Sequence, residues 1–265
     1  MSIRSIPIAS VIAMFAVLLP ASSTRAADPV PHVESKYSAA ELDKVENTPP
    51  PGFVALFNGK DLTGWKGLLK APLDNPARRA NLSPEARQAA QQEADKNMAA
   101  HWKVENGIII YDGNKGRSLC TTKDYGDFEM WVDWKIEAGG DSGIYLRGSP
   151  QVQIWDPANK PAGGVNSGGL YNNQKGPHDP TAAADRPVGQ WNRFQIIMIG
   201  DKVTVFLNGN KVVDNVVLEN YWERNKPIYP TGQIELQDHN SRLEFKNIYI
   251  REITSPSPLK GRGQG

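Results

Sequence analysis

Strict alternation of apolar and polar residues over 128–136 constrains the fold more than any other feature of this 265-residue chain. One set of alternate positions holds Phe128, Met130, Val132, Trp134 and Ile136, and the other holds Glu129, Trp131, Asp133 and Lys135. Successive side chains of a β-strand point to opposite faces of a sheet. The segment therefore predicts a long strand with one face in a core, and similar alternation follows at 143–147, 152–155, 234–237 and 243–250.

Turn residues indicate that these strands are joined as antiparallel hairpins. Asn208-Gly209 separates 203–207 from 211–213, and Asn106-Gly107 separates 102–105 from 108–111. An Asn-Gly pair supplies the positive φ angles that a tight hairpin turn requires. Each sheet must also bury its apolar face against another layer. We therefore predict an all-β fold, a two-layer antiparallel β-sandwich or jelly roll.

One helix is expected to interrupt the strands. Ser83 suits the N-cap, Pro84 the first helical position and Glu85 the first turn. Apolar residues then recur every four positions, at Leu82, Ala86, Ala90, Ala94 and Met98. Because most of this stripe is alanine, it is too thin for a second core. We predict a surface helix over 83–99, inserted at the edge of the sandwich.

The two ends of the chain differ from the part between them. Arg4 precedes an apolar run at 6–19 and small residues, which is the pattern of an export signal cleaved after Ala26 or Ala27. An N-terminal membrane anchor is the alternative. We expect a signal peptide at 1–26, an extended polar and proline-rich linker at 27–51, a single domain at 52–254 and a disordered tail at 255–265. The mature protein is then periplasmic or secreted, with no membrane span.

Composition and missing motifs exclude several function classes. The chain has 30 Lys and Arg against 29 Asp and Glu, a net charge of +1 that offers no basic footprint for nucleic acid. The single cysteine, Cys120, excludes a disulfide framework and a cysteine-rich metal site. No Gly-x-Ser-x-Gly, phosphate-binding loop or His-Glu-x-x-His motif is present. Retaining sandwich glucanases carry a Glu-x-Asp-x-x-Glu motif on one strand. The nearest match in this chain is Glu129 with Asp133, which has no third acid and therefore disfavours that mechanism.

What survives is a polar face spread over several strands. Alternation places Glu129 with Asp133, Tyr145 with Arg147, Gln151 with Gln153 and Trp155, and Glu235 with Gln237 and His239. Such a set is typical of sugar sites, because hydroxyls need paired polar partners and the C–H faces of sugars stack on aromatic rings. A solvated sheet face without function is the alternative.

Four sequence blocks, at 57–65, 140–148, 151–156 and 232–239, resemble the 3-keto-disaccharide hydrolase family. The resemblance extends over about 52–253. It implies a concanavalin-like jelly roll and activity on 3-keto-glucosides, often in exported bacterial proteins. Two positions depart from the usual pattern: Gln151 stands where many members have Glu, and Lys246 begins a triplet that is Arg-Asn-Ile in many members.

The reaction implied by the resemblance requires three kinds of catalytic group. A ketone at C3 acidifies the C2 proton, so a base can remove it and the C1 glycosidic oxygen leaves by β-elimination; water then adds back, which gives net hydrolysis. The enzyme supplies a base, a donor for the enolate oxygen and an acid for the leaving oxygen. We expect Asp133 or Glu235 as the base, Arg147 as the enolate stabiliser and His239 as the acid.

The remaining polar residues are expected to bind substrate. One concave sheet face, within reach of a single sugar ring, should be lined by Asp133, Tyr145, Arg147, Gln153, Glu235, Gln237 and His239. The substrate-binding set is Glu129, Tyr145, Gln153, Trp155 and Gln237. No cofactor is required, although a divalent cation held by Asp133, Glu235 and His239 could replace Arg147. The expected partner is a small carbohydrate. The alternative function is a non-catalytic, lectin-like sugar-binding module, since fold alone does not separate the two classes.

Overall fold

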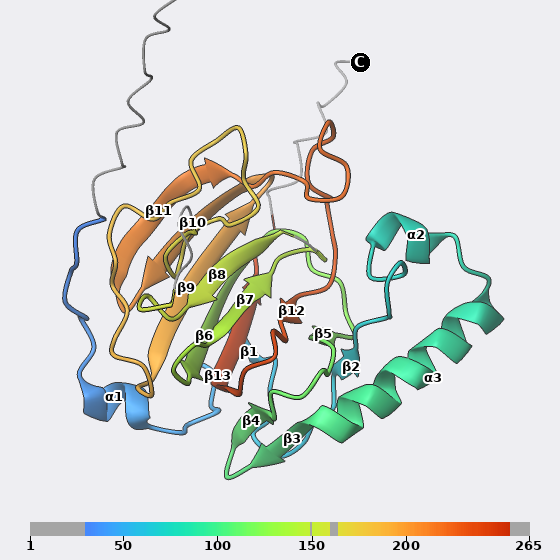
Figure 1. Cartoon of the computed structure of the whole chain (residues 1–265), viewed down its shortest axis with the longest axis horizontal. Coiled ribbons are helices and arrows are strands. Elements are labelled where there is room, and N and C mark those ends of the chain that lie inside the picture. Colours follow the sequence, from blue (N-terminus) through green and yellow to red (C-terminus); the bar gives the residue numbers. More distant parts are fainter. Residues whose placement is uncertain (1–29, 149, 160–163, 255–265) are drawn as a thin grey trace, which may run out of the picture.

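The computed structural model describes residues 30–148, 150–159 and 164–254, which form two antiparallel sheets packed face to face (Figure 1). The predicted signal peptide and the predicted tail at 255–265 lie outside the described residues. The alternating strands and the Asn-Gly turns occur where the sequence predicts them. The predicted all-β, two-layer fold is confirmed.

The larger sheet has eight strands in the order β11-β10-β9-β6-β13-β4-β3, and β1 also pairs with β13. Their bounds are β1 (Val54–Ala55), β3 (Trp102–Glu105), β4 (Ile108–Tyr111), β6 (Phe128–Ile136), β9 (Asn192–Ile199), β10 (Lys202–Leu207), β11 (Asn210–Val217) and β13 (Leu243–Glu252). The smaller sheet has the order β2-β5-β12-β7-β8. It comprises β2 (Trp65–Gly67), β5 (Leu119–Thr121), β7 (Asp141–Tyr145), β8 (Gln151–Trp155) and β12 (Glu235–Leu236).

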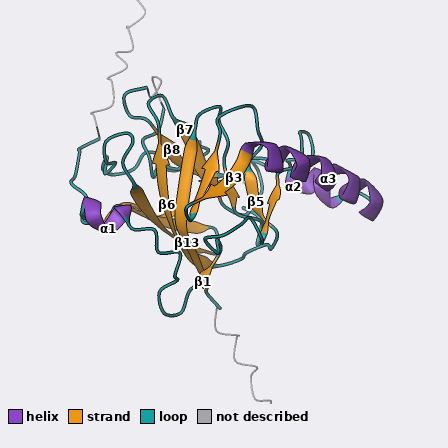
Figure 2. Ribbon diagram, turned by 90° about the horizontal axis from the view of Figure 1, so that it is seen from below, coloured by secondary structure: helices purple, strands orange, loops and turns teal. Residues whose placement is uncertain are grey.

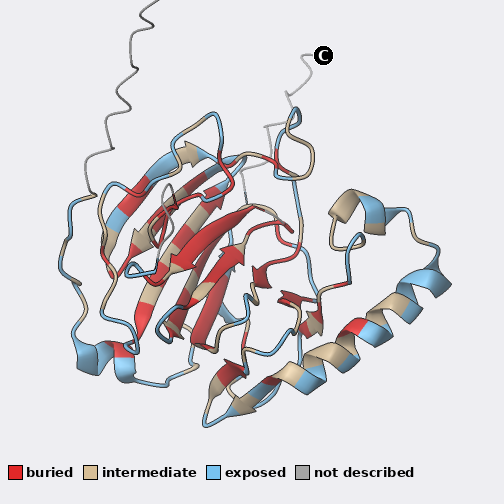
Figure 3. Cartoon of the chain, in the orientation of Figure 1, coloured by how far each residue is buried: buried red, intermediate tan, exposed pale blue. Residues whose placement is uncertain are grey.

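The core lies between the two sheets, where each contributes the apolar half of its alternating residues. Strand β6 buries Phe128, Met130 and Val132 completely, and the smaller sheet buries Ile144 and Val152 against them. Figure 3 shows this buried layer running through both sheets. Removing these side chains from water is the main stabilising contribution, and it fixes which residues of each strand face outward.

Helix α3 (Pro84–His101) confirms the predicted surface insertion at the edge of the sandwich. The Ser83 hydroxyl accepts a hydrogen bond from the Ala86 amide at 3.2 Å, as an N-cap should. The helix packs on edge strand β2, where Gly67 allows a close approach: a Cβ there would lie 2.2 Å from the Ala94 carbonyl oxygen. Figure 2 shows α3 beside the short helix α2 (Pro76–Ala80), which the sequence did not predict. No helix among the described residues is long and apolar enough to cross a membrane.

The expectation of an extended linker before residue 52 is wrong for the described part of that segment. Residues 39–43 form helix α1 (Ala39–Asp43), which begins with a capping box between Ser38 and Glu41. Leu42 is completely buried. Asn47 and Asn247 exchange backbone-to-side-chain hydrogen bonds of 2.9 and 3.0 Å. One buried leucine and this asparagine pair attach the segment to the larger sheet, although its composition is polar.

Candidate functional site

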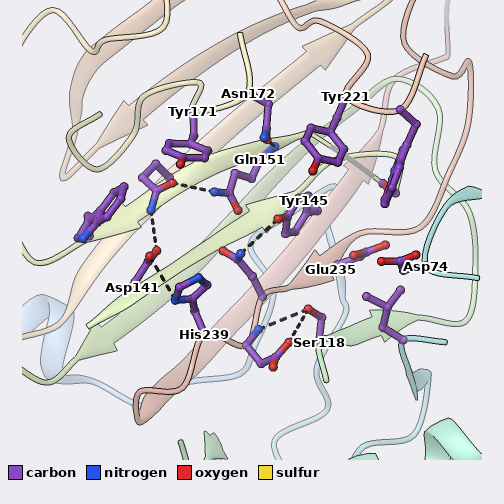
Figure 4. A pocket seen from close by; sticks show the side chains of 17 residues that line it. Asp74, Ser118, Asp141, Tyr145, Gln151, Tyr171, Asn172, Tyr221, Glu235 and His239 are labelled. Atoms are coloured by element: carbon purple, nitrogen blue, oxygen red, sulfur yellow. Dashed lines mark hydrogen bonds and ion pairs between the residues drawn. The ribbon is translucent and has the colours of Figure 1, made fainter. Parts of the chain in front are cut away.

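A cavity of about 330 Å³ lies on the face of the smaller sheet that points away from the core (Figure 4). The core takes Ile144 from strand β7, so Asp141, Gly143 and Tyr145 point the other way. Strand pairing arranges the lining side chains in three rows. The first row is Glu235, Tyr145 and Gln151, the second is Gln237, Gly143 and Gln153, and the third contains Asp141 and Trp155.

Gly143 leaves space in the middle of this floor. A Cβ at this position would lie 2.5 Å from the Gln151 side-chain oxygen and 3.0 Å from the Val152 carbonyl oxygen. Any larger residue would therefore displace the Gln151 amide. The glycine allows the two glutamines of β8 to lie across the floor of the cavity.

A chain of hydrogen bonds connects the floor to a histidine at the rim. Gln151 Nε2 donates to Gln153 Oε1 at 2.7 Å, and Gln153 Nε2 donates to Asp141 Oδ1 at 2.9 Å. The other carboxylate oxygen of Asp141 lies 3.3 Å from His239 Nδ1. Burial raises the pKa of Asp141, although the neighbouring His239 acts in the opposite direction. The His239 side chain remains 53% exposed, so its ring is accessible from the cavity mouth.

Tyr145 extends its hydroxyl, as a neutral phenol, from the first row toward Gln237 in the middle row of the cavity. Gln237 Nε2 donates to its hydroxyl oxygen at 3.2 Å. Burial raises the pKa of Tyr145, and the nearby Glu235 raises it further. The hydroxyl therefore retains its proton and can donate it to a ligand.

Two carboxyl groups meet at the other end of the cavity. Glu235 is buried, and its Oε1 accepts a hydrogen bond of 2.7 Å from Gln233 Nε2. Burial raises the pKa of Glu235 against the opposing hydrogen bond from Gln233, and Asp74 also raises it. Figure 4 shows the Asp74 and Glu235 side chains side by side. A third acid, Asp238, accepts a hydrogen bond of 3.1 Å from the Ser118 hydroxyl, and burial raises its pKa.

Aromatic side chains form the walls at both ends. Trp155 and Tyr171 stand 5.8 Å apart between ring centroids, and Tyr221 and Trp222 stand 4.9 Å apart. Tyr171 and Tyr221 are among the most exposed large apolar residues of the described chain. Paired rings at each end provide two platforms for sugar C–H faces.

The structure brings most of the predicted site residues together. The cavity contains Tyr145, Gln153, Trp155, Glu235, Gln237 and His239. Sequence reasoning missed Asp74, Ser118, Asp141, Tyr171, Asn172, Tyr221, Trp222 and Asp238, and it assigned no role to Gln151. Asp141 has the same strand parity as Gly143 and Tyr145, so alternation could have identified it. The loop residues carry no comparable signal.

Asp133 and Glu129 do not belong to this cavity. Both lie on β6 of the larger sheet, with partners of their own. Asp133 is 0% exposed and accepts hydrogen bonds from Arg193 Nε at 2.6 Å, Arg193 Nη2 at 2.8 Å and Asn247 Nδ2 at 2.7 Å. Glu129 accepts from the Trp131 indole and from Gln195, and forms an ion pair with Arg251. The expectation that Asp133 meets Glu235 around one sugar ring is therefore wrong, and Glu129 does not line the cavity in which it was expected to bind substrate.

Arg147 also lies outside this cavity. Its guanidinium group instead binds backbone carbonyl groups and one carboxylate. Its Nε donates to the Gly126 carbonyl at 3.0 Å, and its Nη1 to the Gly200 and Tyr229 carbonyls at 2.7 and 3.2 Å. Its Nη2 binds Asp127 at 2.9 Å. The left-handed backbone at Arg147 (φ 55°) turns the side chain away from the face that Tyr145 occupies. The position predicted for an enolate stabiliser is thus a structural one.

The alternative cation site is not assembled either. Asp133 lies on the larger sheet, whereas Glu235 lies on β12 of the smaller sheet and His239 in the chain just after β12, so these three groups cannot share one ion. Within residues 30–148, 150–159 and 164–254, no group of three or more His, Cys, Asp or Glu side chains is placed to hold a metal ion.

Comparison with known proteins identifies relatives of the chain. Residues 52–251 match the model of the 3-keto-alpha-glucoside-1,2-lyase-like domain family. A 3-keto-disaccharide hydrolase from Bacteroides thetaiotaomicron is 21% identical over an alignment of 272 positions, gaps included, that covers 81% of this chain and 83% of the relative. A solved structure of a candidate glycosyl hydrolase from Parabacteroides distasonis superposes with a TM-score of 0.59 at 24% identity. That alignment covers 78% of this chain and 99% of the other, and supports the fold.

Proposed function

Because the chain belongs to the family of 3-keto-alpha-glucoside-1,2-lyase-like domains, we propose that it cleaves 3-keto-glucosides, including 3-keto-disaccharides, in the cavity of the smaller sheet. One observation supports this most strongly: the Asp141–His239 pair stands at the mouth of a cavity lined with amides and aromatic rings. A lectin needs the amides and rings but no titratable pair. Since the site combines both, an enzyme accounts for it better than a binding module.

We assign the removal of the C2 proton to His239. Asp141 faces Nδ1, which leaves Nε2 of a neutral ring free to act as the base. The electron pair of the C2–H bond forms the enolate of the C3 ketone. The C1–O bond then breaks, and the imidazolium returns its proton to the leaving oxygen.

We assign the stabilisation of the enolate, the role first expected of Arg147, to Tyr145. Gln237 donates to the phenol oxygen, so the hydroxyl proton remains available for the C3 oxygen. Burial keeps this phenol neutral at physiological pH. Addition of water to the resulting enone places OH on C1 and H on C2, which completes hydrolysis; without this addition the enzyme is a lyase.

The length of the cavity favours a substrate with two rings. Glu235 pairs with Tyr145, four residues along β7 from Asp141, so the two ends of the site are about 13 Å apart along the strand. This exceeds the reach of one pyranose. We place the oxidised ring between His239 and the Tyr145 hydroxyl, which Gln237 of the middle row holds, and the second ring near Glu235, Asp74 and Tyr221. Glu235 then binds hydroxyls of the second ring and does not act as the base.

The direct test is incubation of purified protein with 3-keto-trehalose and 3-keto-sucrose, beside trehalose and sucrose. We expect selective loss of the two keto-sugars. Binding of keto-sugars without turnover would support a sugar-binding module in place of an enzyme. We also propose that the protein is exported to the periplasm or beyond, which N-terminal sequencing from its native host would test: a chain that starts at Ala27 or Asp28 supports export.

A further inference from the structure

A second cavity, of about 260 Å³, separates the inserted helices from the smaller sheet, and basic side chains from three elements line it. Lys66 comes from β2, Arg79 from α2 and Arg87 from α3. We propose that this cavity binds a small oxyanion such as phosphate, sulfate or a carboxylate. The helices that form one side of it are those shown beside β2 in Figure 1.

The buried Glu235 lies close enough to Arg79 and Lys66 for both cations to oppose the burial-driven rise of its pKa, but it does not pair with either of them. Among the described residues, none of the three cations forms an ion pair with a carboxylate. Arg79 Nη1 donates only to the Asp74 carbonyl at 3.2 Å, and Arg87 Nη2 donates to the Arg79 and Ala80 carbonyls at 2.8 and 3.5 Å. The one carboxylate that lines the described cavity belongs to Asp124, which is exposed. Three like charges around one space repel each other, and a bound anion offsets that repulsion.

The chemistry of the side chains favours an oxyanion over chloride. A guanidinium group offers parallel N–H donors that match two oxygens of a carboxylate, sulfate or phosphate. Lys66 adds a compact charge and Thr231 a hydroxyl group to the lining, whereas the Nε2 group of Gln91 is committed to the Gly67 carbonyl and to Asp95. Arg147 also borders the space, but its donors are committed to Asp127 and to backbone carbonyls, so it is not a ligand. The net charge of +1 for the whole chain shows that this concentration of positive charge is local.

The basic cavity adjoins the sugar cavity. Gln233 lines the basic cavity and donates to Glu235, which lines the sugar cavity. Arg79 Nη2 would lie 3.1 Å from a Cβ on Gly148, another residue of the sugar cavity. The oxyanion can therefore be a free ion, or an acidic group on the second ring of the substrate. The latter source rests on the proposed function.

Titration calorimetry with inorganic phosphate and with sulfate tests the site, with sodium chloride holding the ionic strength constant. We expect millimolar binding to the wild-type protein and at least a five-fold loss in Arg79→Gln and in Lys66→Gln. Arg78→Gln is the matched control, because Arg78 is an exposed neighbour on α2 that does not line the cavity. No binding above the chloride background, or an equal loss in Arg78→Gln, would overturn the proposal. Circular dichroism confirms that each variant is folded.

Kinetics separate the two sources of the anion. We would compare a neutral 3-keto-disaccharide with one that carries a carboxylate on its second ring. A higher KM in Arg79→Gln for the acidic substrate alone assigns the site to a substrate group, whereas unchanged KM values with lost phosphate binding assign it to a free ion. If neither substrate is cleaved, the proposed function fails, and calorimetry still decides whether the anion site exists.

Discussion

The Nδ1 atom of His239 lies 3.3 Å from the Oδ2 atom of Asp141, across the mouth of the cavity in the smaller sheet. Two elements far apart in the sequence create this pair, the start of β7 and the chain just after β12. Gln153 holds the other oxygen of Asp141. A carboxylate fixed on one side and an exposed imidazole on the other is an arrangement suited to proton transfer.

Loss of this pair should reduce turnover without unfolding the protein. We expect His239→Gln and Asp141→Asn to lower kcat on a 3-keto-disaccharide by about 10²–10⁴-fold, because general base catalysis contributes that much. The matched control is His101→Gln, which removes a histidine that faces Asp112 at 3.1 Å outside the cavity. Steady-state kinetics with thermal melts check this. Wild-type turnover in His239→Gln would remove His239 from the mechanism.

Gly143→Ala should reduce activity by displacing a side chain on the floor of the cavity. Its Cβ would lie 2.5 Å from Gln151 Oε1, so the amide must move and the hydrogen bond from Gln151 to Gln153 is disturbed. We expect kcat/KM to fall by about 10²-fold, since small misplacements of site groups have effects of that size. Gly176→Ala is the control, because the nearest atoms to its Cβ are at an ordinary 3.6 Å. Equal kinetics in both variants would show that the Gln151 position does not matter.

Glu235→Gln should stabilise the protein at neutral pH. Burial raises the pKa of Glu235 in the folded state above its ordinary value of 4.5. The folded protein therefore favours the protonated form of Glu235. The stability that this form contributes is fully present below pH 4.5 and is lost as the pH rises through the folded-state pKa. We expect the variant to melt a few degrees above the wild type at pH 7, and no difference near pH 4.

Glu244→Gln provides a comparison of opposite sign. Burial alone would raise the pKa of Glu244, but hydrogen bonds and charge from Lys135 and Arg242 lower it below 4.5. This carboxylate contributes stability above pH 4.5 that is lost as the pH falls through its folded-state pKa. The variant should melt below the wild type at pH 7. Melting curves of both variants that shift in the same direction at pH 7 would contradict this account of the two carboxyl groups.

Arg147→Lys should reduce stability and spare the chemistry. The guanidinium group binds three carbonyl oxygens and Asp127, and a lysine cannot reproduce that set of contacts. We expect a loss of about 3 kcal/mol in the free energy of unfolding. At a temperature where the variant remains folded, kcat should stay near that of the wild type. Denaturant titration and kinetics together check this, and a stable but inactive variant would restore Arg147 as a candidate for catalysis.

Alternation predicted which residues of one strand share a face, and this was enough to group Gln153 with Trp155 and Glu235 with Gln237. It carried no information about which sheet a strand joins. Strand β6 shows the same polar alternation. Asp133 nevertheless lies on the larger sheet, where Arg193 and Asn247 donate hydrogen bonds to its carboxylate. Both partners come from strands 60 and 114 residues away in sequence. Such long-range pairing, and the loops that bring Tyr171 and Tyr221 to the cavity, depend on tertiary contacts that strand periodicity does not encode.

Cleavage of 3-keto-trehalose in D₂O tests the central claim most directly. The account predicts that the keto-sugar is consumed, that the released 3-keto-glucose carries deuterium at C2, and that trehalose is unchanged. Product incubated alone for the same time corrects for spontaneous exchange next to the ketone. Survival of the keto-sugar, or release of 3-keto-glucose that keeps its C2 proton, would contradict the account.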